Sequence, residues 1–214
     1  MITACALAGI PEIHAGDDLV QIAADALATC ELAPLQTGDV LVFAQKVVSK
    51  AEGQTIALSS LIPSTEAIEI AEHQNKDPRH VQVVLDESQS LLRKQNGVLI
   101  CETKHGFVCA NAGVDASNVP ADDSVLLLPV DPDASARQLR AGVSGHFGVQ
   151  IGVIIADSFG RAWRLGQADV AIGCAGLLAT ADARGTEDRN GRELGSTEIA
   201  IADEIASAAD LTRS

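Results

Sequence analysis

Residues 154–173, IIADSFGRAWRLGQADVAIG, decide the fold because they join two apolar runs through a polar turn. The first run extends back along the chain and predicts a buried strand over residues 149–156, and a shorter strand is predicted over residues 170–174. Asp157 follows the first strand at once, and Ser158 comes next. This order places a carboxylate at the expected mouth of a sheet.

A second stretch, CANAGVDASN at residues 109–118, repeats the pattern of an apolar run that ends in a carboxylate. An aspartate at a strand end commonly makes an ordinary turn with its own backbone, and each aspartate alone indicates that reading. Together, however, the two stretches offer oxygen ligands of the kind that Mg²⁺ and Mn²⁺ prefer. These oxygen ligands are Asp115, Ser117, Asn118, Asp157 and Ser158.

Two arginines, Arg161 and Arg164, come shortly after Asp157. A guanidinium group binds phosphate and carboxylate through paired hydrogen bonds. The sequence therefore predicts a metal-dependent site for an anionic, phosphorylated ligand, with both arginines holding acidic substrates. Trp163 between them is predicted to pack in the core, and the alternative is a stacking surface for a flat ring.

The two standard phosphate-binding motifs, GxxxxGK[ST] and GxGxxG after a strand, do not occur, so a nucleotide would bind in another way. The candidate cationic contacts are Lys46 and Lys50, in AQKVVSKAEG. Residues 40–48 are predicted as a strand, and lysines four positions apart in an extended chain point to the same side. The alternative is that both are solvated lysines at the end of a strand.

The composition excludes several classes of protein. The chain has 214 residues, of which 47% are apolar and 21% charged, so we expect a soluble globular protein of one large domain or two small ones. The net charge of -14 argues against a nucleic-acid partner. Five scattered cysteines indicate the reducing cytoplasm. We expect no membrane partner, because the sequence has no spanning apolar run and no signal peptide.

The rest of the chain mixes helical and extended patterns. Helices are expected over three ranges: residues 17–32, 78–93 and 131–143. Ser196 is expected to cap a last helix. Extended segments are expected at residues 97–102, 106–110 and 125–129, the first two as a hairpin. Because hairpin and strand–helix–strand units occur together, the predicted fold class is α+β or mixed α/β.

Six segments occur in an order that matches one known family: GIPEIHAGDDL, VVSKAEG, HGFVCANAGVDASNV, LLLPVDPDASA, IIADSFGRAWRLGQADVAIG and GREL…TEIAIADEIASAA. On these motifs the chain resembles the coenzyme F-420-0:L-glutamate ligases, which add glutamates to the deazaflavin coenzyme F-420 in a GTP-dependent reaction. The resemblance covers residues 9–211 and implies a single ligase domain over residues 1–214. The motifs NAGVDASN and DSFGRAWRLGQ are specific to that family.

The resemblance implies an α+β fold of the family's own, built as an intertwined homodimer. It implies GTP as co-substrate, Mg²⁺ or Mn²⁺ as divalent metal, and K⁺ as a monovalent cation. Carried over to matching positions, it implies metal ligands at Asp115, Asp157 and Ser158. It implies nucleotide contacts at Ile10, Pro11, Glu12, Ile13, Gln45, Lys46, Lys50 and Asn118.

The implied reaction begins with transfer of the γ-phosphate of GTP to the terminal carboxylate of coenzyme F-420-0. The amine of L-glutamate then attacks the acyl phosphate and forms an amide, and later glutamates are joined through their γ-carboxylates. Phosphoryl transfer needs positioning and charge neutralisation, which suits metal ions held by Asp115 and Asp157.

Two departures from the family pattern bear on activity. Residues 182–185 and 188–194 lack the tyrosines that family members carry there, and the family continues past the last helix into a glycine-containing loop and a strand that help bind the nucleotide. The chain is therefore expected to be C-terminally truncated. Two alternatives are an inactive or partner-dependent remnant that binds GTP and metal, and the ligase half of a bifunctional protein with a flavin nitroreductase-like domain.

Overall fold

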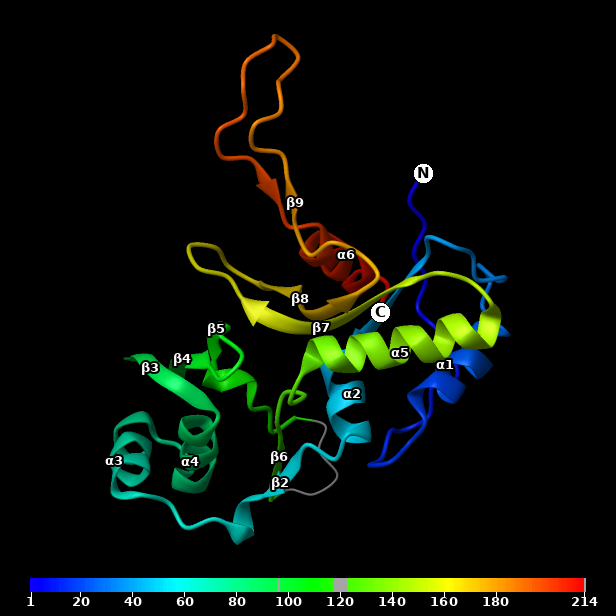
Figure 1. The fold of residues 1–214 in the computed structure, drawn as a ribbon. Helices are drawn as coiled ribbons and strands as arrows, with labels where there is room; N and C mark the ends of the chain where they lie inside the picture. Colours follow the sequence, from blue (N-terminus) through cyan, green and yellow to red (C-terminus); the bar gives the residue numbers. More distant parts are fainter. Residues whose placement is uncertain (96, 118–122, 214) are drawn as a thin grey trace.

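The computed structural model describes residues 1–95, 97–117 and 123–213 (Figure 1). Helices and mixed parallel and antiparallel sheets are packed together in this part of the chain, which confirms the predicted α+β class. The elements gather around two main groups of buried apolar side chains, one on each side of the α2–β2–β6 region. No helix within the described ranges is long and apolar enough to cross a bilayer.

The first group surrounds a sheet of three strands in the order β1–β7–β8: β1 (Val40–Ala44), β7 (Gly152–Gly160) and β8 (Gln167–Ala175). Strand β1 is parallel to β7, and β8 forms an antiparallel hairpin with β7. Helices α1 (Leu19–Leu27) and α5 (Pro132–Phe147) cover one face of this sheet, and α6 (Ile201–Asp210) covers the other (Figure 1).

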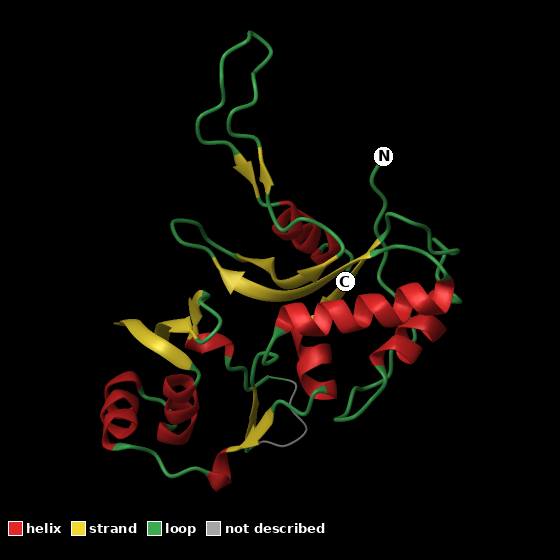
Figure 2. Cartoon of the chain, in the orientation of Figure 1, coloured by secondary structure: helices red, strands yellow, loops and turns green. Residues whose placement is uncertain are grey.

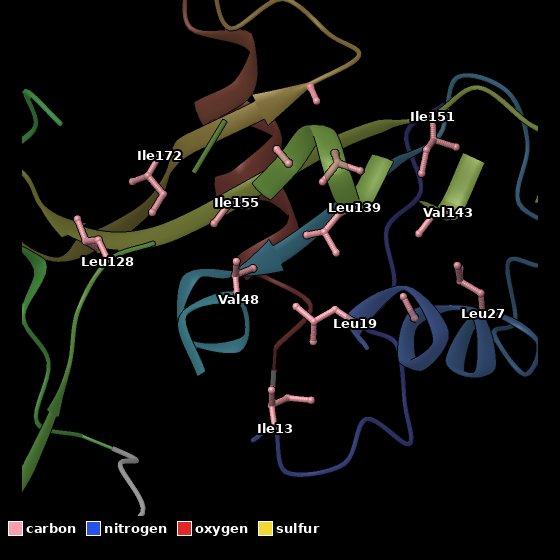
Figure 3. Packing of buried hydrophobic residues seen from close by; sticks show 14 residues of the cluster. Ile13, Leu19, Leu27, Val48, Leu128, Leu139, Val143, Ile151, Ile155 and Ile172 are labelled. Atoms are coloured by element: carbon pink, nitrogen blue, oxygen red, sulfur yellow. The ribbon is translucent and has the colours of Figure 1, made fainter. Parts of the chain in front are cut away.

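Strand β7 has apolar side chains on both faces because both faces are covered. Val153 and Ile155 pack with the residues of α1 and α5, and Figure 3 shows Ile155 among Leu19, Leu139 and Val48. Ile154 and Ala156 alternate with them and pack against Ala202 and Ala206 of α6. A continuous apolar run is the pattern expected of a strand buried on both sides.

The second group lies between helices α3 (Thr65–Gln74) and α4 (Pro78–Asp86) and a sheet of β3 (Ser88–Gln95), β4 (Val98–Thr103) and β5 (Val108–Ala110) (Figure 2). Leu99 and Cys101 of β4 and Val81 and Val84 of α4 are fully buried here. The two-stranded sheet of β2 (Thr55–Ala57) and β6 (Ser124–Leu126) lies between the two groups.

Residues 182–194, which lack the tyrosines expected from the family resemblance, belong to a projecting arm (orange in Figure 1). Its base is an antiparallel pair of short strands, β9 (Ala181–Asp182) and β10 (Glu198–Ile199). The prediction that Ser196 caps the last helix is therefore wrong. Strand β10 lies between Ser196 and α6, and Ala200 occupies the N-cap position of α6.

Two other predicted elements are wrong in part. The strand predicted over residues 40–48 ends at Ala44, and helix α2 (Gln45–Ala51) follows it. Its paired valines suggested a strand, but Gln45, Val48 and Ser49 are buried at helical spacing. The helix predicted over residues 78–93 ends at Asp86, and the chain turns into β3. Strand β3 gains its backbone hydrogen bonds from β4, a partner that its own sequence does not reveal.

Other predictions are confirmed. The expected hairpin is β4–β5, and Asp131 caps α5 by accepting a hydrogen bond from the Ala134 amide, with Pro132 at the first turn. Helix α5 extends to Phe147, beyond its predicted end, and Gly148 closes it in a left-handed conformation. Strands β7 and β8 are both longer than predicted, so Asp157 lies within β7 rather than after it.

The packing of α5 on β8 generates a first prediction. A Cβ atom at Gly173 would lie 2.4 Å from the carbonyl carbon of Pro132 and 2.5 Å from its oxygen, so Gly173→Ala forces backbone to move. We expect a loss of about 1–3 kcal/mol of unfolding free energy, measured by urea denaturation. Gly160→Ala on β7 is the control, because nothing lies within 4 Å of its Cβ position. Equal stability of the two variants would contradict this packing.

Candidate functional site

The site begins where β1 gives way to α2. The Lys46 ammonium lies 2.5 Å from Asp115 Oδ2 and donates to Ser117 Oγ at 2.6 Å. Asp115 also accepts hydrogen bonds from the Ser117 amide at 2.7 Å and the Ser117 hydroxyl at 3.0 Å. Burial opposes ionisation of Asp115, but these bonds outweigh it and lower the pKa of the carboxyl. Asp115 therefore makes the expected turn with Ser117 and is also paired with Lys46.

Asp157 lies on β7 beside this pair, opposite Val170 of β8. Burial, together with the charges of Asp115 and Asp169, raises the pKa of its carboxyl from 3.8 to about 6, against a hydrogen bond from the Ser158 amide and the charge of Lys46. The structure thus brings Asp115, Asp157 and Lys46 within electrostatic reach of one another. Among the ion pairs of the described residues, none includes Asp157.

Ser158 faces β8, where its register partner is Asp169. The Ser158 hydroxyl donates to Asp169 Oδ1 at 2.6 Å, and Asp169 is only 2% exposed. Arg213, just after α6, forms an ion pair with the other oxygen of Asp169. The sequence analysis did not select Asp169 or Arg213. Their contacts join positions 11 and 44 residues apart, and no local pattern in the sequence reports such contacts.

The predicted nucleotide contacts occupy two different environments. Lys50 lies one helical turn after Lys46 and pairs with Glu12 Oε1 at 2.5 Å. The Lys50 side chain is 11% exposed and that of Glu12 68% exposed, so the pair lies at the surface edge. This pair lowers the pKa of Glu12 through the hydrogen bond from Lys50. Ile10 and Pro11 are exposed beside it.

Two of the predicted nucleotide contacts have side chains inside the protein. Ile13 belongs to the first apolar group, where Figure 3 shows it below Leu19. Gln45 is 2% exposed, and its amide nitrogen donates to Ser49 Oγ at 2.7 Å and to the Leu127 carbonyl at 2.9 Å. These side chains support the segments that carry Glu12 and Lys46. Asn118 lies outside the described residues.

The turn between β7 and β8 holds the two predicted arginines. The Arg161 guanidinium donates to the carbonyls of Leu165 at 2.5 Å and Gly166 at 3.4 Å, so it closes its own turn. Arg164 is exposed. The core-packing prediction for Trp163 is wrong, since this residue is fully exposed and has a φ of 66°. The alternative stacking role for Trp163 stays a prediction.

The oxygen atoms of the site are of the kind that a divalent cation needs. Mg²⁺ is commonly bound by one or two carboxylates and completes its octahedral shell with water and phosphate oxygens. Asp115, Asp157 and the Ser158 hydroxyl offer hard oxygen donors of this kind. Within the described ranges, no three His, Cys, Asp or Glu side chains are grouped closely enough to form a cage by themselves. The residues therefore fit a cation that shares its shell with a phosphorylated substrate.

Two cavities in the described part of the chain are lined by residues outside this site. One of ≈ 550 Å³ is lined by α3 residues such as Glu66 and His73, together with Lys94. Another of ≈ 420 Å³ lies over β3 and β4 at Arg93 and Val98. Neither is lined by any predicted site residue. The chemistry of the Asp115–Asp157 region, rather than cavity size, therefore identifies the candidate site.

The sequence profile described as F420-0:Gamma-glutamyl ligase matches residues 9–214. The chain belongs to the F420-0:gamma-glutamyl ligase family. This confirms the resemblance seen in the motifs.

Several members of the family are similar over most of the chain. The coenzyme F420:L-glutamate ligase of Methanocaldococcus jannaschii is 47% identical over 178 residues, which are 83% of this chain and 71% of that protein. The ligase of the same name from Methanopyrus kandleri is 48% identical over 200 residues, 94% of this chain and 77% of its own length. That of Haloarcula marismortui is 45% identical over 212 residues, with 96% and 79% covered.

The raised pKa of Asp157 generates a prediction for the metal-free protein. Since this pKa rises from 3.8 to about 6, the folded state binds the proton more tightly than the unfolded state does. The contribution of Asp157 therefore favours folding at acid pH and is lost as pH rises through about 6. We expect Asp157→Asn to raise the free energy of unfolding by about 2–3 kcal/mol at pH 8, with little difference near pH 4.

Denaturation curves of the two proteins with a chelator present, at pH 4 and pH 8, measure this effect. Asp25→Asn is the matched control, because Asp25 is exposed on α1 and accepts a hydrogen bond from Gln21 that an asparagine oxygen can also accept. A lower stability of Asp157→Asn at pH 8 would show that the carboxylate has a stabilising partner instead.

Proposed function

We propose that this chain is a ligase that joins L-glutamate to coenzyme F420-0 with GTP as the phosphoryl donor. Family membership supports the substrates, because the relatives carry the name coenzyme F420:L-glutamate ligase. The observation that carries the chemistry is the Asp157 carboxylate, raised in pKa beside the Lys46–Asp115 pair. A carboxylate that forms no ion pair among the described residues, with the Lys46 ammonium in electrostatic reach, suits a cation and an anionic phosphate that bind together.

Each side chain has a role in this proposal. Asp115, Asp157 and Ser158 would hold Mg²⁺ or Mn²⁺, which when bound neutralises the charge on the phosphates. The Lys46 ammonium pairs with the Asp115 carboxylate in this structure. The same charge would orient a phosphate oxygen of the nucleotide. Lys50 binds the nucleotide at the edge formed by Glu12.

The proposed reaction has two displacements. A carboxylate oxygen of coenzyme F420-0 attacks the γ-phosphorus of GTP, and the bond to the bridging oxygen breaks to release GDP. The amine of L-glutamate then attacks the carbonyl carbon of the acyl phosphate. Inorganic phosphate leaves with the bonding electrons, and the amine gives up a proton as the amide forms. The protein contributes position and charge compensation rather than a covalent bond.

The two arginines in the turn between β7 and β8 have different roles in this proposal. Arg161 is committed to the carbonyls of Leu165 and Gly166. We therefore propose that Arg164, whose side chain is exposed, contacts the acidic substrates and that Arg161 shapes the turn. The sequence motifs further support a cytoplasmic homodimer that uses K⁺ with the divalent cation, and these also remain proposals.

Glutamate addition tests the proposed function directly. The chain is incubated with coenzyme F420-0, GTP, L-glutamate and MnCl₂, and mass spectrometry follows the glutamate adducts. We expect addition that requires GTP and metal, and a fall of at least about 100-fold in Asp115→Asn and Asp157→Asn, because charge stabilisation is lost at the reacting phosphate. Asp25→Asn on α1 should retain wild-type activity.

Two results of this assay would contradict the proposal. Full activity in Asp157→Asn would remove that residue from the site. Absence of addition by the wild-type chain, with a relative active alongside, would favour the alternative in which GTP and metal bind without turnover.

The Lys50–Glu12 pair allows a separate prediction for nucleotide binding. Lys50→Met should weaken GTP binding about 10-fold or more, because a hydrogen bond to a charged group contributes about 1.5–3 kcal/mol. Glu12→Gln is the matched variant, since it breaks the ion pair and keeps the lysine. Because the Glu12 carboxylate lies largely in solvent, breaking the pair should hardly change the free energy of unfolding. Calorimetric titration with GTP measures the affinity of each variant. Equal affinity of Lys50→Met and Glu12→Gln would contradict a role for Lys50.

A further inference from the structure

A buried carboxylate adjoins the proposed metal ligands without belonging to them. Asp169 of β8 is 2% exposed, and its two oxygens have different partners. Oδ1 accepts the Ser158 hydroxyl at 2.6 Å, and Oδ2 contacts the Arg213 guanidinium. A buried carboxylate needs such compensation, because removing a charge from water is costly unless it is paired and hydrogen-bonded.

The hydrogen bond to Asp169 fixes the direction of the Ser158 hydroxyl. A serine hydroxyl has one proton to donate and two lone pairs to offer. At Ser158 the proton is committed to Asp169, which lies in the interior, while Ser158 itself is exposed. Adjacent side chains of a strand point to opposite faces, so a cation that both Asp157 and Ser158 bind must lie at the edge of β7 beyond Ala156, where the pairing with β1 ends. The two lone pairs of the hydroxyl are left for such a cation.

Helix α6 holds this carboxylate in place through β8. Ser207 donates to the backbone carbonyl of Asp169 at 2.7 Å, and Asp203 accepts from the Ala171 amide at 2.9 Å. Arg213 also pairs with Asp210 at 2.6 Å, so one guanidinium nitrogen contacts both carboxylates. The end of α6 is thereby connected to the Ser158 hydroxyl through a single buried side chain.

We propose that Asp169 is a positioning residue that aims the oxygen lone pairs of Ser158 at the bound divalent cation, and that Arg213 holds Asp169 for this purpose. The inference rests on the proposed function in one respect, the assignment of Ser158 as a metal ligand. Partners of this kind fix the orientation of ligands, and their loss typically weakens metal affinity about 10–100-fold. A purely structural role would instead affect only the docking of α6 on β8.

Binding of Mn²⁺ alone, measured by electron paramagnetic resonance, distinguishes these roles without any turnover. In Asp169→Asn one side of the amide must turn its NH₂ group toward a donor, either Ser158 or Arg213. We expect Mn²⁺ to bind about 10-fold more weakly to this variant and to Ser158→Ala. The double variant should bind no more weakly than either single one, because both remove the same oriented hydroxyl.

Ser207→Ala is the matched control for structure. It removes a bond between α6 and the backbone of Asp169 but leaves the carboxylate intact, so we expect a lower melting temperature with unchanged Mn²⁺ affinity. If Asp169→Asn fails to fold, Asp169→Leu combined with Arg213→Met replaces the ion pair by apolar groups, a change that proteins often tolerate. This pair should fold and still bind Mn²⁺ about 10-fold more weakly.

Wild-type Mn²⁺ affinity in either folded Asp169 variant would overturn the proposal and leave Asp169 as an anchor for α6. Wild-type affinity in Ser158→Ala would overturn it as well, since the hydroxyl would then not be a ligand. Either result would leave the proposed reaction standing, because that depends on lost glutamate addition in Asp157→Asn, whereas the second would also remove Ser158 from the proposed metal ligands. Equal weakening in Asp169→Asn, Ser158→Ala and their double variant supports the proposal.

Discussion

The structure depends on the burial of β7 on both of its faces. Val153 and Ile155 pack toward α1 and α5, and Ile154 and Ala156 pack toward α6. An ionised side chain cannot replace any of these residues without a large desolvation cost. Asp157, the next residue, is the first position along the strand that is only partly buried. The candidate site thus lies where the double cover of β7 ends.

The charges around this point are unevenly compensated. Asp115 is matched by Lys46, and Asp169 by Arg213. The pKa of Asp115 falls, whereas that of Asp157, which has burial and two neighbouring carboxylates against it, rises to about 6. A folded chain that holds an acidic group in this condition has an electrostatic reason to take up a cation.

Much of the fold could be predicted from local patterns in the sequence. The N-cap of α5, the β4–β5 hairpin and the apolar run of β7 each depend on neighbours in the chain. The proximity of Asp115 and Asp157 was also predicted, since both were placed at the mouth of a sheet. Their electrostatic coupling supports that proximity, even though Asp157 lies within its strand.

The features that sequence reasoning missed depend on partners far along the chain. Gln45 is buried because the Leu127 carbonyl accepts its amide, and β3 is extended because β4 pairs with it. Asp169 requires both Ser158 and Arg213 to be in place. Trp163 was expected in the core from its apolar ring alone, but the turn between β7 and β8 directs it into solvent. Residue type and spacing cannot report contacts of these kinds.

The two lysines of α2 lie on one side of their element, as predicted, although the predicted element was a strand and not a helix. An extended chain and a helix both place residues four apart on one side, so the expectation for Lys46 and Lys50 survives the change from strand to helix. The helix spaces them by one turn, about 6 Å along its axis. Lys46 can therefore reach Asp115 while Lys50 reaches Glu12, and two carboxylates from distant segments meet one short helix. The buried hydrogen bond from Gln45 to the Leu127 carbonyl holds the start of that helix in place. The positions of the Lys46 and Lys50 ammonium groups therefore depend on this contact.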